Sequence, residues 1–571
     1  MFEVKNLIKN EFFPLELPPS FNTNDLANYA TEAISIAKSF GYAFSVPLKY
    51  SGYKSESSRR KFAVPNPYHY CRAVDLIVSN EAMIAAILQK SKYSLTAPTS
   101  KKPKENQAYS KRSNSIAETK EEIEKLYQNK RYEIRLDINS FFDNIYTHSI
   151  PWAIHGIEMA KKRKTDDTLL GNQLDKCLRA LNYNQTNGVL VGNAVSRIVS
   201  EIILCTIDEQ VQKHFSEIEC CRFVDDYYIY TRESSRIQEI IAFIRNCLAQ
   251  YELSFNENKI QINESPFLYG KPWVEEIKQY MHLPADVFLS KLIMEYNQHN
   301  DIAIIKYGLK IVSQYNYSPK IWPTMQSRLI NLWVRFPSLS DRVMVVLWQN
   351  KENLSKVLLK QAIYAVIDES LLLRRDQELI WALWFAKTFN IVLSDKYIAK
   401  VFESSNDVAI VILLDIIYRA NKQNNRVVKP KLIALHDELA AKDIDDKGHP
   451  NKLLWTAHWL LAYEATRNGW LNIDGCIFDY ANKNQFFQEL IRKGIKFYDP
   501  DFAYDEPQQH ENKFEYVTRS ELYSALNKLK QTIKKYGRSG VIEEMLSEEE
   551  LERLYDEIFW QIERDESVYM G

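Results

Sequence analysis

Glycine and proline are scarce in this sequence, with 15 glycines and 19 prolines among 571 residues. This argues against long flexible linkers and favours a helix-rich chain with few elaborate turns. The 7 cysteines include no Cys-x-x-Cys pair, and an odd number fits a reduced interior better than a disulfide framework. No zinc site, HNH-type nuclease signature or P-loop is recognisable, so we expect no coupled nuclease or ATPase.

Long apolar runs are missing as well. The strongest one, residues 408–418, is short and interrupted by Asp415, so it does not predict a membrane span. The first 19 residues lack a basic stretch followed by a long apolar one, which argues against a signal peptide. Together with the cysteine pattern, these features predict a cytoplasmic protein with no membrane partner.

An excess of charge of one sign is also missing, because the formal net charge is -1. A protein that coats nucleic acid along its whole length usually has a clear basic excess. Positive charge is local instead: residues 51–130 hold 15 Lys and Arg against 8 Asp and Glu, and the tract 101–112 supplies much of that surplus. The surplus predicts either one basic face or an ordinary solvated surface.

The chain is too long for a single core, and its pattern changes along its length. Residues 1–130 mix short apolar helical stretches with a polar basic connector, and residues 131–270 contain strand-like segments. From 271 to 514 helix follows helix with no strict repeat period, which predicts an irregular helical solenoid or bundle. Residues 515–571 are charged and helical in pattern, and we expect them to form a docking or capping helix.

Three segments within residues 131–270 have clear local patterns. Residues 132–142 alternate between apolar and polar side chains as a strand does, and residues 192–211 have helical apolar spacing. CRFVDDYYIYT, residues 221–231, is typical of a strand, a tight acidic turn and a second strand.

The acidic turn of the third segment places two adjacent carboxylates, Asp225 and Asp226, between apolar and aromatic residues. Like charges this close are costly to desolvate, and a divalent cation is the usual way to offset that cost. Asp137 lies in a similar strand-like stretch upstream. Three carboxylates that converge in this way can hold two divalent cations for in-line phosphoryl transfer.

Four motifs resemble those of reverse transcriptases and occur in the order found in that family. They are LDINSFFDNIYTHSIPW (136–152), NGVLVGNAVSR (187–197), FVDD (223–226) and LSFNENKIQI (253–262). The first two, with RRKFAVPNPYHY (59–70), are most similar to the abortive-infection, AbiK-like group of defence-associated bacterial reverse transcriptases.

The resemblance covers roughly residues 55–265 and implies an α+β fold. Reverse-transcriptase-like fingers would lie within residues 1–130 and a palm within 131–270. A large all-α domain, a HEAT-like helical repeat or bundle, would take the place of a thumb at 271–514.

The resemblance also implies roles for single residues. Asp137, Asp225 and Asp226 would be catalytic metal ligands, and the backbone carbonyl of Ile138 would complete the coordination shell of one ion. Mg²⁺ or Mn²⁺ would be the cofactor. Lys259 would offset negative charge on the leaving pyrophosphate, unless it is an exposed lysine at the end of a strand.

A nucleotide site is implied by residues of the fingers and of the first two motifs. Phe142 would pack under the sugar and select deoxynucleotides, unless it is a core phenylalanine. Asn193 would face the nucleotide or merely cap the following helix. The implied nucleotide-binding residues are Phe142, Gly188, Asn193, Arg59, Arg60 and Lys61.

The function implied is that of a DNA polymerase in bacterial antiphage defence. Relatives are associated with template-independent synthesis primed on a tyrosine hydroxyl, so that the DNA product stays attached to the protein. This chain has Asn187-Gly188 and Leu190 where the family commonly has Gln-Gly and proline, which puts template alignment in doubt.

The partners implied are deoxynucleotide triphosphates, the DNA product and further copies of the chain as a homo-oligomer. The priming tyrosine and the phage trigger are not identified. Two alternatives stay open: an RNA-templated reverse transcriptase that copies a partner RNA, and a catalytically decayed scaffold that binds nucleic acid or a phage protein.

Overall fold

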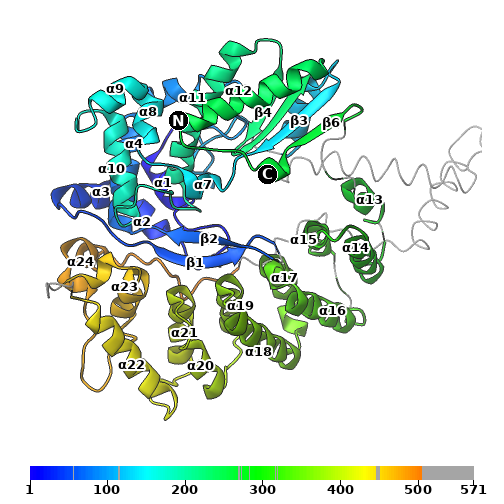
Figure 1. The fold of residues 1–571 in the computed structure, drawn as a ribbon. Helices are drawn as coiled ribbons and strands as arrows, with labels where there is room; N and C mark the ends of the chain where they lie inside the picture. Colours follow the sequence, from blue (N-terminus) through cyan, green and yellow to red (C-terminus); the bar gives the residue numbers. More distant parts are fainter. Residues whose placement is uncertain are drawn as a thin grey trace, which may run out of the picture.

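The computed structural model describes residues 1–504 except 56, 114–115, 268–270, 272, 282, 316, 318 and 445–450, and it leaves out the side chains of 116–118. The predicted charged segment 515–571 lies outside the described residues, as do the last ten residues of the predicted helical domain. Helices and strands are both present, and the second half is mainly helical (Figure 1).

The first 130 residues form helices around one β-hairpin. Its strands, β1 and β2, pair antiparallel from Leu48 opposite Val64 to Tyr53 opposite Arg59. The elements of this part are α1 Val4–Lys9, α2 Asn24–Asn28, α3 Ala30–Ser39, β1 Leu48–Tyr53, β2 Arg59–Val64, α4 Pro67–Ser79, α5 Glu81–Leu88 and α6 Ile116–Leu126.

A four-stranded antiparallel sheet follows, with the strand order β4-β5-β3-β6. Its strands are β3 Tyr132–Asp137, β4 Glu219–Phe223, β5 Asp226–Thr231 and β6 Gln261–Glu264. The predicted strand–turn–strand at 221–231 is confirmed by β4 and β5. The predicted strand 132–142 is too long, because Ser140 has a left-handed φ of 43° and a helix begins at Phe141.

Six α-helices lie between the strands in sequence. They are α7 Phe141–Asn144, α8 Ser149–His155, α9 Ile157–Lys162, α10 Leu170–Leu181, α11 Ala194–His214 and α12 Ile237–Ala249. The longest, α11, confirms the helix predicted at 192–211, and its Ile198 and Ile202 are fully buried in the same apolar cluster as Ile134 and Leu136 of β3. This helix therefore belongs to the same core as β3.

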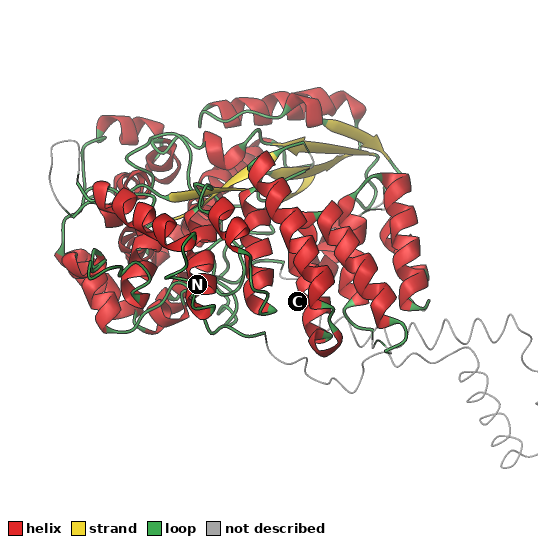
Figure 2. Cartoon of the chain, turned by 90° about the horizontal axis from the view of Figure 1, so that it is seen from below, coloured by secondary structure: helices red, strands yellow, loops and turns green. Residues whose placement is uncertain are grey.

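Twelve α-helices are described after the sheet. They are α13 Trp273–Gln279, α14 Ala285–His299, α15 Ile302–Val312, α16 Trp322–Arg335, α17 Ser340–Gln349, α18 Lys356–Leu373, α19 Asp376–Thr388, α20 Asp395–Val401, α21 Asp407–Arg419, α22 Val428–Ala441, α23 Trp459–Asn468 and α24 Gln485–Arg492. Figure 1 shows α14 to α24 following one another in an arc along the β1–β2 hairpin, and Figure 2 shows the same helices from below. Within the described ranges, no helix is long and apolar enough to cross a bilayer.

The arc is fastened to the β1–β2 hairpin through the first turn of α19. The backbone N–H of Ser51 donates to Asp376 Oδ2 at 2.7 Å, and Arg59 makes two bonds of 2.5 and 2.6 Å to the Glu378 carboxylate. The side chain of Glu378 is buried, so this ion pair lies at a closed contact.

The end of the arc returns to the beginning of the chain. Phe21 pairs with Tyr498 in an antiparallel bridge, and the N–H of Asn22 donates to the carbonyl of Phe497 at 3.1 Å. The N–H of Asp499 donates to the carbonyl of Ser20 at 2.8 Å. The N-terminal segment therefore lies between the sheet-containing half and the last helices.

Candidate active site

The sheet brings the three predicted aspartates together. Asp137 is the last residue of β3 and lies directly opposite Asp226, the first residue of β5. Asp225 lies in the turn between β4 and β5, and its carbonyl accepts a hydrogen bond from the N–H of Ile138 at 3.3 Å. The end of β3 and the β4–β5 turn thus place the three carboxylates, and the backbone of Ile138, together at one end of the two central strands.

The hairpin turn has an unusual backbone at Val224, whose φ is 52°. A β-branched residue is rarely found in this left-handed region, so the surroundings must hold the turn in place. The carbonyl of Val224 accepts a bond of 2.7 Å from Arg222 Nη1, and its N–H donates to Thr96 Oγ1 at 3.1 Å. The N–H and the carbonyl of Val224 are therefore both held by hydrogen bonds to side chains.

Arg222 is fully buried and is held by two acids of α11. Its Nη2 donates to Asp208 Oδ2 at 2.8 Å and to Glu201 Oε2 at 3.0 Å. Tyr227 donates to Asp208 Oδ1 at 2.8 Å, and Thr96 donates to Glu201 Oε1 at 2.6 Å. This network was not predicted from the sequence; the available signal was two acids seven residues apart, each beside an apolar run of α11.

The aspartates are unfavourable neighbours when no cation is bound. Burial raises the pKa of Asp225, and the charge of Asp137 adds to that effect. Burial, followed by the charges of Asp225 and Asp137, raises the pKa of Asp226 to about 6. A cluster of carboxylates that repel one another in a partly desolvated place fits a divalent cation, because hard cations prefer oxygen ligands.

Lys259 lies at the same end of the central strands as the three aspartates. It ends the 3₁₀ turn Glu257–Lys259, and its Nζ lies 2.6 Å from Asp137 Oδ2. That hydrogen bond raises the pKa of Lys259. The backbone of the preceding segment is joined to β3, since the N–H of Asn256 donates to the carbonyl of Asp137 at 2.8 Å. The fourth motif is thereby placed against the first.

The second motif lies against α7. Gly188 has a φ of 81°, and a Cβ there would lie 3.0 Å from the carbonyl oxygen of Asp143, so only glycine fits without strain. The N–H of Val189 donates to the carbonyl of Phe142 at 2.9 Å. Phe142 is partly buried against the core, and the structure places it beside the second motif.

Asn193 is fully buried and caps α11. Its Oδ1 accepts from the N–H of Ser196 at 2.9 Å, and its Nδ2 donates to the carbonyl of Leu190 at 2.8 Å. Of the two interpretations given for Asn193, the helix cap is the one that these bonds describe.

The three basic residues of β2 point to different neighbours. Arg59 is occupied by Glu378 of α19, whereas Arg60 and Lys61 are exposed. The positive charge of Arg60 counteracts part of the rise in the pKa of Asp225, and it acts on Glu16 in the same way.

Two segments from the first 65 residues cover part of the second motif. The N–H of Ala63 in β2 donates to the carbonyl of Val191 at 3.1 Å. Gly192 has a φ of 106°, and a Cβ there would lie 2.6 Å from Cγ of Pro14. The chain itself therefore lies against residues 191–192 of this loop.

Comparison with known families identifies the part of the chain that holds these residues. Residues 70–278 match the family model described as reverse transcriptase (RNA-dependent DNA polymerase). The chain therefore carries a reverse transcriptase family domain, and the matched segment includes Asp137, Asp225, Asp226 and Lys259. This confirms the family-level prediction, while the AbiK-like and defence-associated part stays a prediction. No curated protein matches the sequence.

Solved telomerase structures have a distant similarity to this fold. The C-terminally truncated apo telomerase from Candida tropicalis is 12% identical, with 40% of this chain and 51% of that one covered and a TM-score of 0.28. The apo telomerase from the same organism is 12% identical, with 63% and 73% covered and a TM-score of 0.31. Telomerase from Candida albicans in complex with a TWJ fragment of telomeric RNA is 11% identical, with 60% and 66% covered and a TM-score of 0.27. The chain thus spans about half the length of the first of these proteins.

Proposed function

We propose that this protein is a DNA polymerase of the reverse transcriptase type that joins deoxynucleotides by two-metal phosphoryl transfer. The convergence of Asp137, Asp225 and Asp226 at the end of β3 and the β4–β5 turn carries this proposal. The raised pKa of Asp225 and of Asp226 supports it, because the cluster gains most from a bound cation.

In this proposal Asp137 and Asp225 would bind both ions, the carbonyl of Ile138 would complete one coordination shell, and Asp226 would be the adjacent, weaker ligand. Mg²⁺ or Mn²⁺, when bound, polarises the triphosphate and lowers the pKa of the attacking hydroxyl. Lys259, which lies on the Asp137 carboxylate, offsets negative charge on the leaving pyrophosphate.

Nucleotide binding is assigned to the neighbouring residues. Phe142 and Gly188 lie where α7 meets the second motif and are assigned to the nucleotide on the family resemblance, and Arg60 and Lys61 are exposed cations suited to phosphate oxygens. Arg59 holds the fingers to the arc, and Asn193 supports the loop from within as a helix cap.

We further propose that synthesis proceeds without a template, begins on a tyrosine hydroxyl of the protein and serves antiphage defence in the cytoplasm. The AbiK-like sequence of the first two motifs supports this, as does Leu190 in place of the common proline. The covering of residues 191–192 by Ala63 and Pro14 supports it too, because a template strand cannot occupy a surface that the chain already fills. The helical half would mediate homo-oligomers and respond to a phage trigger.

The test is incubation of the purified protein with Mg²⁺ and labelled deoxynucleotides, without template or primer, followed by a denaturing protein gel with and without nuclease. We expect a labelled smear at and above the protein band that nuclease collapses. Product only after addition of an RNA template and primer would instead identify an RNA-templated enzyme.

The control variant is Asp225→Asn, which removes one metal ligand at nearly constant volume. Its synthesis should fall at least about a hundredfold while its folding is kept. Asp167→Asn is the matched change at an exposed aspartate that pairs with Lys176, and it should leave synthesis unchanged. Equal activity of the two variants would contradict the metal assignment.

A further inference from the structure

A second group of metal-ligating side chains lies outside the aspartate site, where α13 meets α14. Glu276 belongs to α13, and Glu295 and His299 lie four residues apart on one face of α14. One ligand atom from each of the three side chains lies within 4.8 Å of the others. The spacing along the sequence matches no known metal motif, so only the structure reveals the group.

Each of the two carboxylates in this group has a buried oxygen atom that accepts no hydrogen bond among the described residues. Glu276 Oε2 and Glu295 Oε2 are shielded from solvent, and neither accepts a hydrogen bond from the part of the chain that the structure describes. Glu295 is only 9% exposed. Because a buried carboxylate oxygen without a hydrogen bond costs free energy, both oxygens would gain from a positive ion held between them.

Both unpartnered oxygens are directed at the same nitrogen. His299 Nε2 lies 3.5 Å from Glu276 Oε2 and 3.6 Å from Glu295 Oε2. An imidazolium that paired directly with a carboxylate would close to about 2.8 Å. Two ligands of a tetrahedral ion with bonds of about 2.1 Å lie about 3.4 Å apart. The observed separations fit a shared ion better than a direct ion pair.

We propose that Glu276, Glu295 and His299 bind one divalent transition-metal ion, with Zn²⁺ preferred. One imidazole nitrogen and two carboxylate oxygens are ligands that Zn²⁺ takes, and Zn²⁺ stands above Mn²⁺ in affinity for such sites. Mg²⁺ requires a mainly oxygen, octahedral shell, so this site differs in chemistry from the three aspartates. The partial exposure of His299 and Glu276 leaves a fourth position for water.

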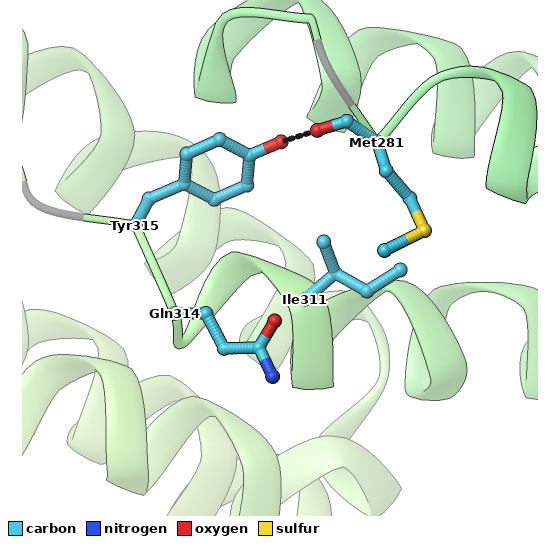
Figure 3. Close-up of a pocket in the computed structure, with 4 residues that line it drawn as sticks. All are labelled: Met281, Ile311, Gln314 and Tyr315. Carbon is cyan, nitrogen blue, oxygen red and sulfur yellow. Dashed lines mark hydrogen bonds between the residues drawn. The ribbon is translucent and has the colours of Figure 1, made fainter. Parts of the chain in front are cut away.

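The position of Glu276 is fixed because the short helix α13 is held on both sides. Trp273 Nε1 donates to Asp301 Oδ2 at 3.3 Å at its beginning. After its end, the Tyr315 hydroxyl donates to the carbonyl of Met281 at 2.7 Å, a bond that Figure 3 shows across a small crevice. The ligand from α13 is therefore held in place facing those from α14.

Such an ion would join two parts of the molecule. The segment that matches the reverse transcriptase family ends at residue 278, within α13, and α14 is the first long helix of the arc. A bond from Glu276 through the ion to Glu295 and His299 would fix how the arc is mounted on the sheet-containing domain.

The experiment is titration of the chelator-stripped, full-length protein with Co²⁺, followed by visible absorption, and competition by Zn²⁺. All variants are made on an Asp225→Asn background, which weakens binding at the aspartates. We expect one equivalent of Co²⁺ with the strong absorption of a four-coordinate site, displaced by Zn²⁺. His299→Gln should remove the band and weaken Zn²⁺ binding at least about a hundredfold.

Two further variants separate binding from folding. Glu295→Gln should also remove the band, yet it should fold well in chelator because it removes a buried charge. Glu275→Gln changes the neighbouring carboxylate, which pairs with Lys278 at 3.4 Å, and it should keep the band. A protein without the band, or a band that survives both His299→Gln and Glu295→Gln, would overturn the proposal and leave a simple ion pair.

Discussion

At the scale of single residues, the aspartates depend on a neighbour that takes no part in the proposed chemistry. Arg222 bonds to the carbonyl of Val224, one residue before Asp225, and is itself anchored by Asp208 and Glu201. A buried cation with two anions on one helix thus holds a turn whose backbone would otherwise be unfavourable.

Replacing Arg222 with methionine should lower the free energy of unfolding by about 3–5 kcal/mol, because Asp208 and Glu201 would remain buried without their cation. Urea denaturation measures this. Arg245→Met is the matched control, since Arg245 and Glu257 form an exposed pair and should contribute at most about 1 kcal/mol. Equal losses in the two variants would contradict the role given to the network.

A pH-dependent contribution to stability comes from His69, which is 3% exposed and lies 3.0 Å from Ser45 Oγ. Burial lowers the pKa of His69 to about 4. The unfolded chain binds this proton near its ordinary value of about 6.5, so the unfolded state gains stability first as the pH falls. The folded protein should lose about 3 kcal/mol between pH 6.5 and 4 from this group.

The measurement is urea denaturation of the wild type and of His69→Gln at pH 7, 5.5 and 4.5. The difference in unfolding free energy between the two proteins should shrink or reverse in favour of the variant as the pH falls. A difference that stays constant with pH would show that His69 has the same pKa in the folded and the unfolded chain, contrary to the burial argument.

The catalytic aspartates could be predicted from the sequence, whereas the residues that support them were harder to recognise. Asp137 and the Asp225–Asp226 pair are recognisable because each interrupts an apolar, strand-like run. Arg222 has no such signal, because its partners lie 14 and 21 positions away on another element. For Asn193 the sequence offered the helix cap as one of two interpretations, and the choice between them depended on where α11 begins.

At the scale of elements, the β1–β2 hairpin is the link between the two halves. Its strand β1 lies on the first turn of α19, and the Arg59–Glu378 ion pair crosses this contact. The hairpin was not predicted, because its strands have polar faces and its partner helix lies more than 300 residues later in the chain.

Arg59→Met should lower the free energy of unfolding by about 2–4 kcal/mol, because it leaves the buried Glu378 carboxylate without its counter-ion. It should also speed amide hydrogen exchange across residues 48–64. Adding Glu378→Met should recover part of that loss, since both charges are then gone. Strictly additive losses in this double-mutant cycle would show that the two side chains do not interact.

Elements with a strong local pattern were the ones predicted well. The β4–turn–β5 unit and α11 follow from alternation and helical spacing within a single stretch. The strand at 132–142 was predicted too long, because the left-handed backbone of Ser140 and the start of α7 at Phe141 interrupt it, and the alternation of side chains does not contain that turn.

At the scale of the whole molecule, the arc begins at the sheet and ends on the N-terminal segment. Phe497 and Tyr498 are fully buried, and Phe497 packs against Phe12 and Trp459. Helix after helix could be predicted from the sequence, but the return of the last turn to residues 20–22 could not, because no local pattern records so distant a contact.

A chain that ends at residue 494 should lose cooperative unfolding, whereas one that ends at residue 504 keeps every contact described above and should unfold cooperatively. Loss of one buried aromatic side chain costs about 3–5 kcal/mol, and two such losses approach the whole stability of a typical domain. Calorimetry of the two truncated chains checks this. Equal melting temperatures would show that the return of the arc contributes little.

Because Phe21 pairs with Tyr498, the N-terminal segment cannot complete its folding until nearly the whole described chain has been synthesised. At about 5–20 residues per second, a ribosome that has made residue 21 needs about 25–95 s to reach residue 498. During that interval the side chains of Phe12 and Phe21 emerge into the cell without Phe497 and Tyr498, their neighbours in the folded chain. The nascent chain should therefore engage chaperones early, and its yield should rise when translation and folding are slowed together by cold.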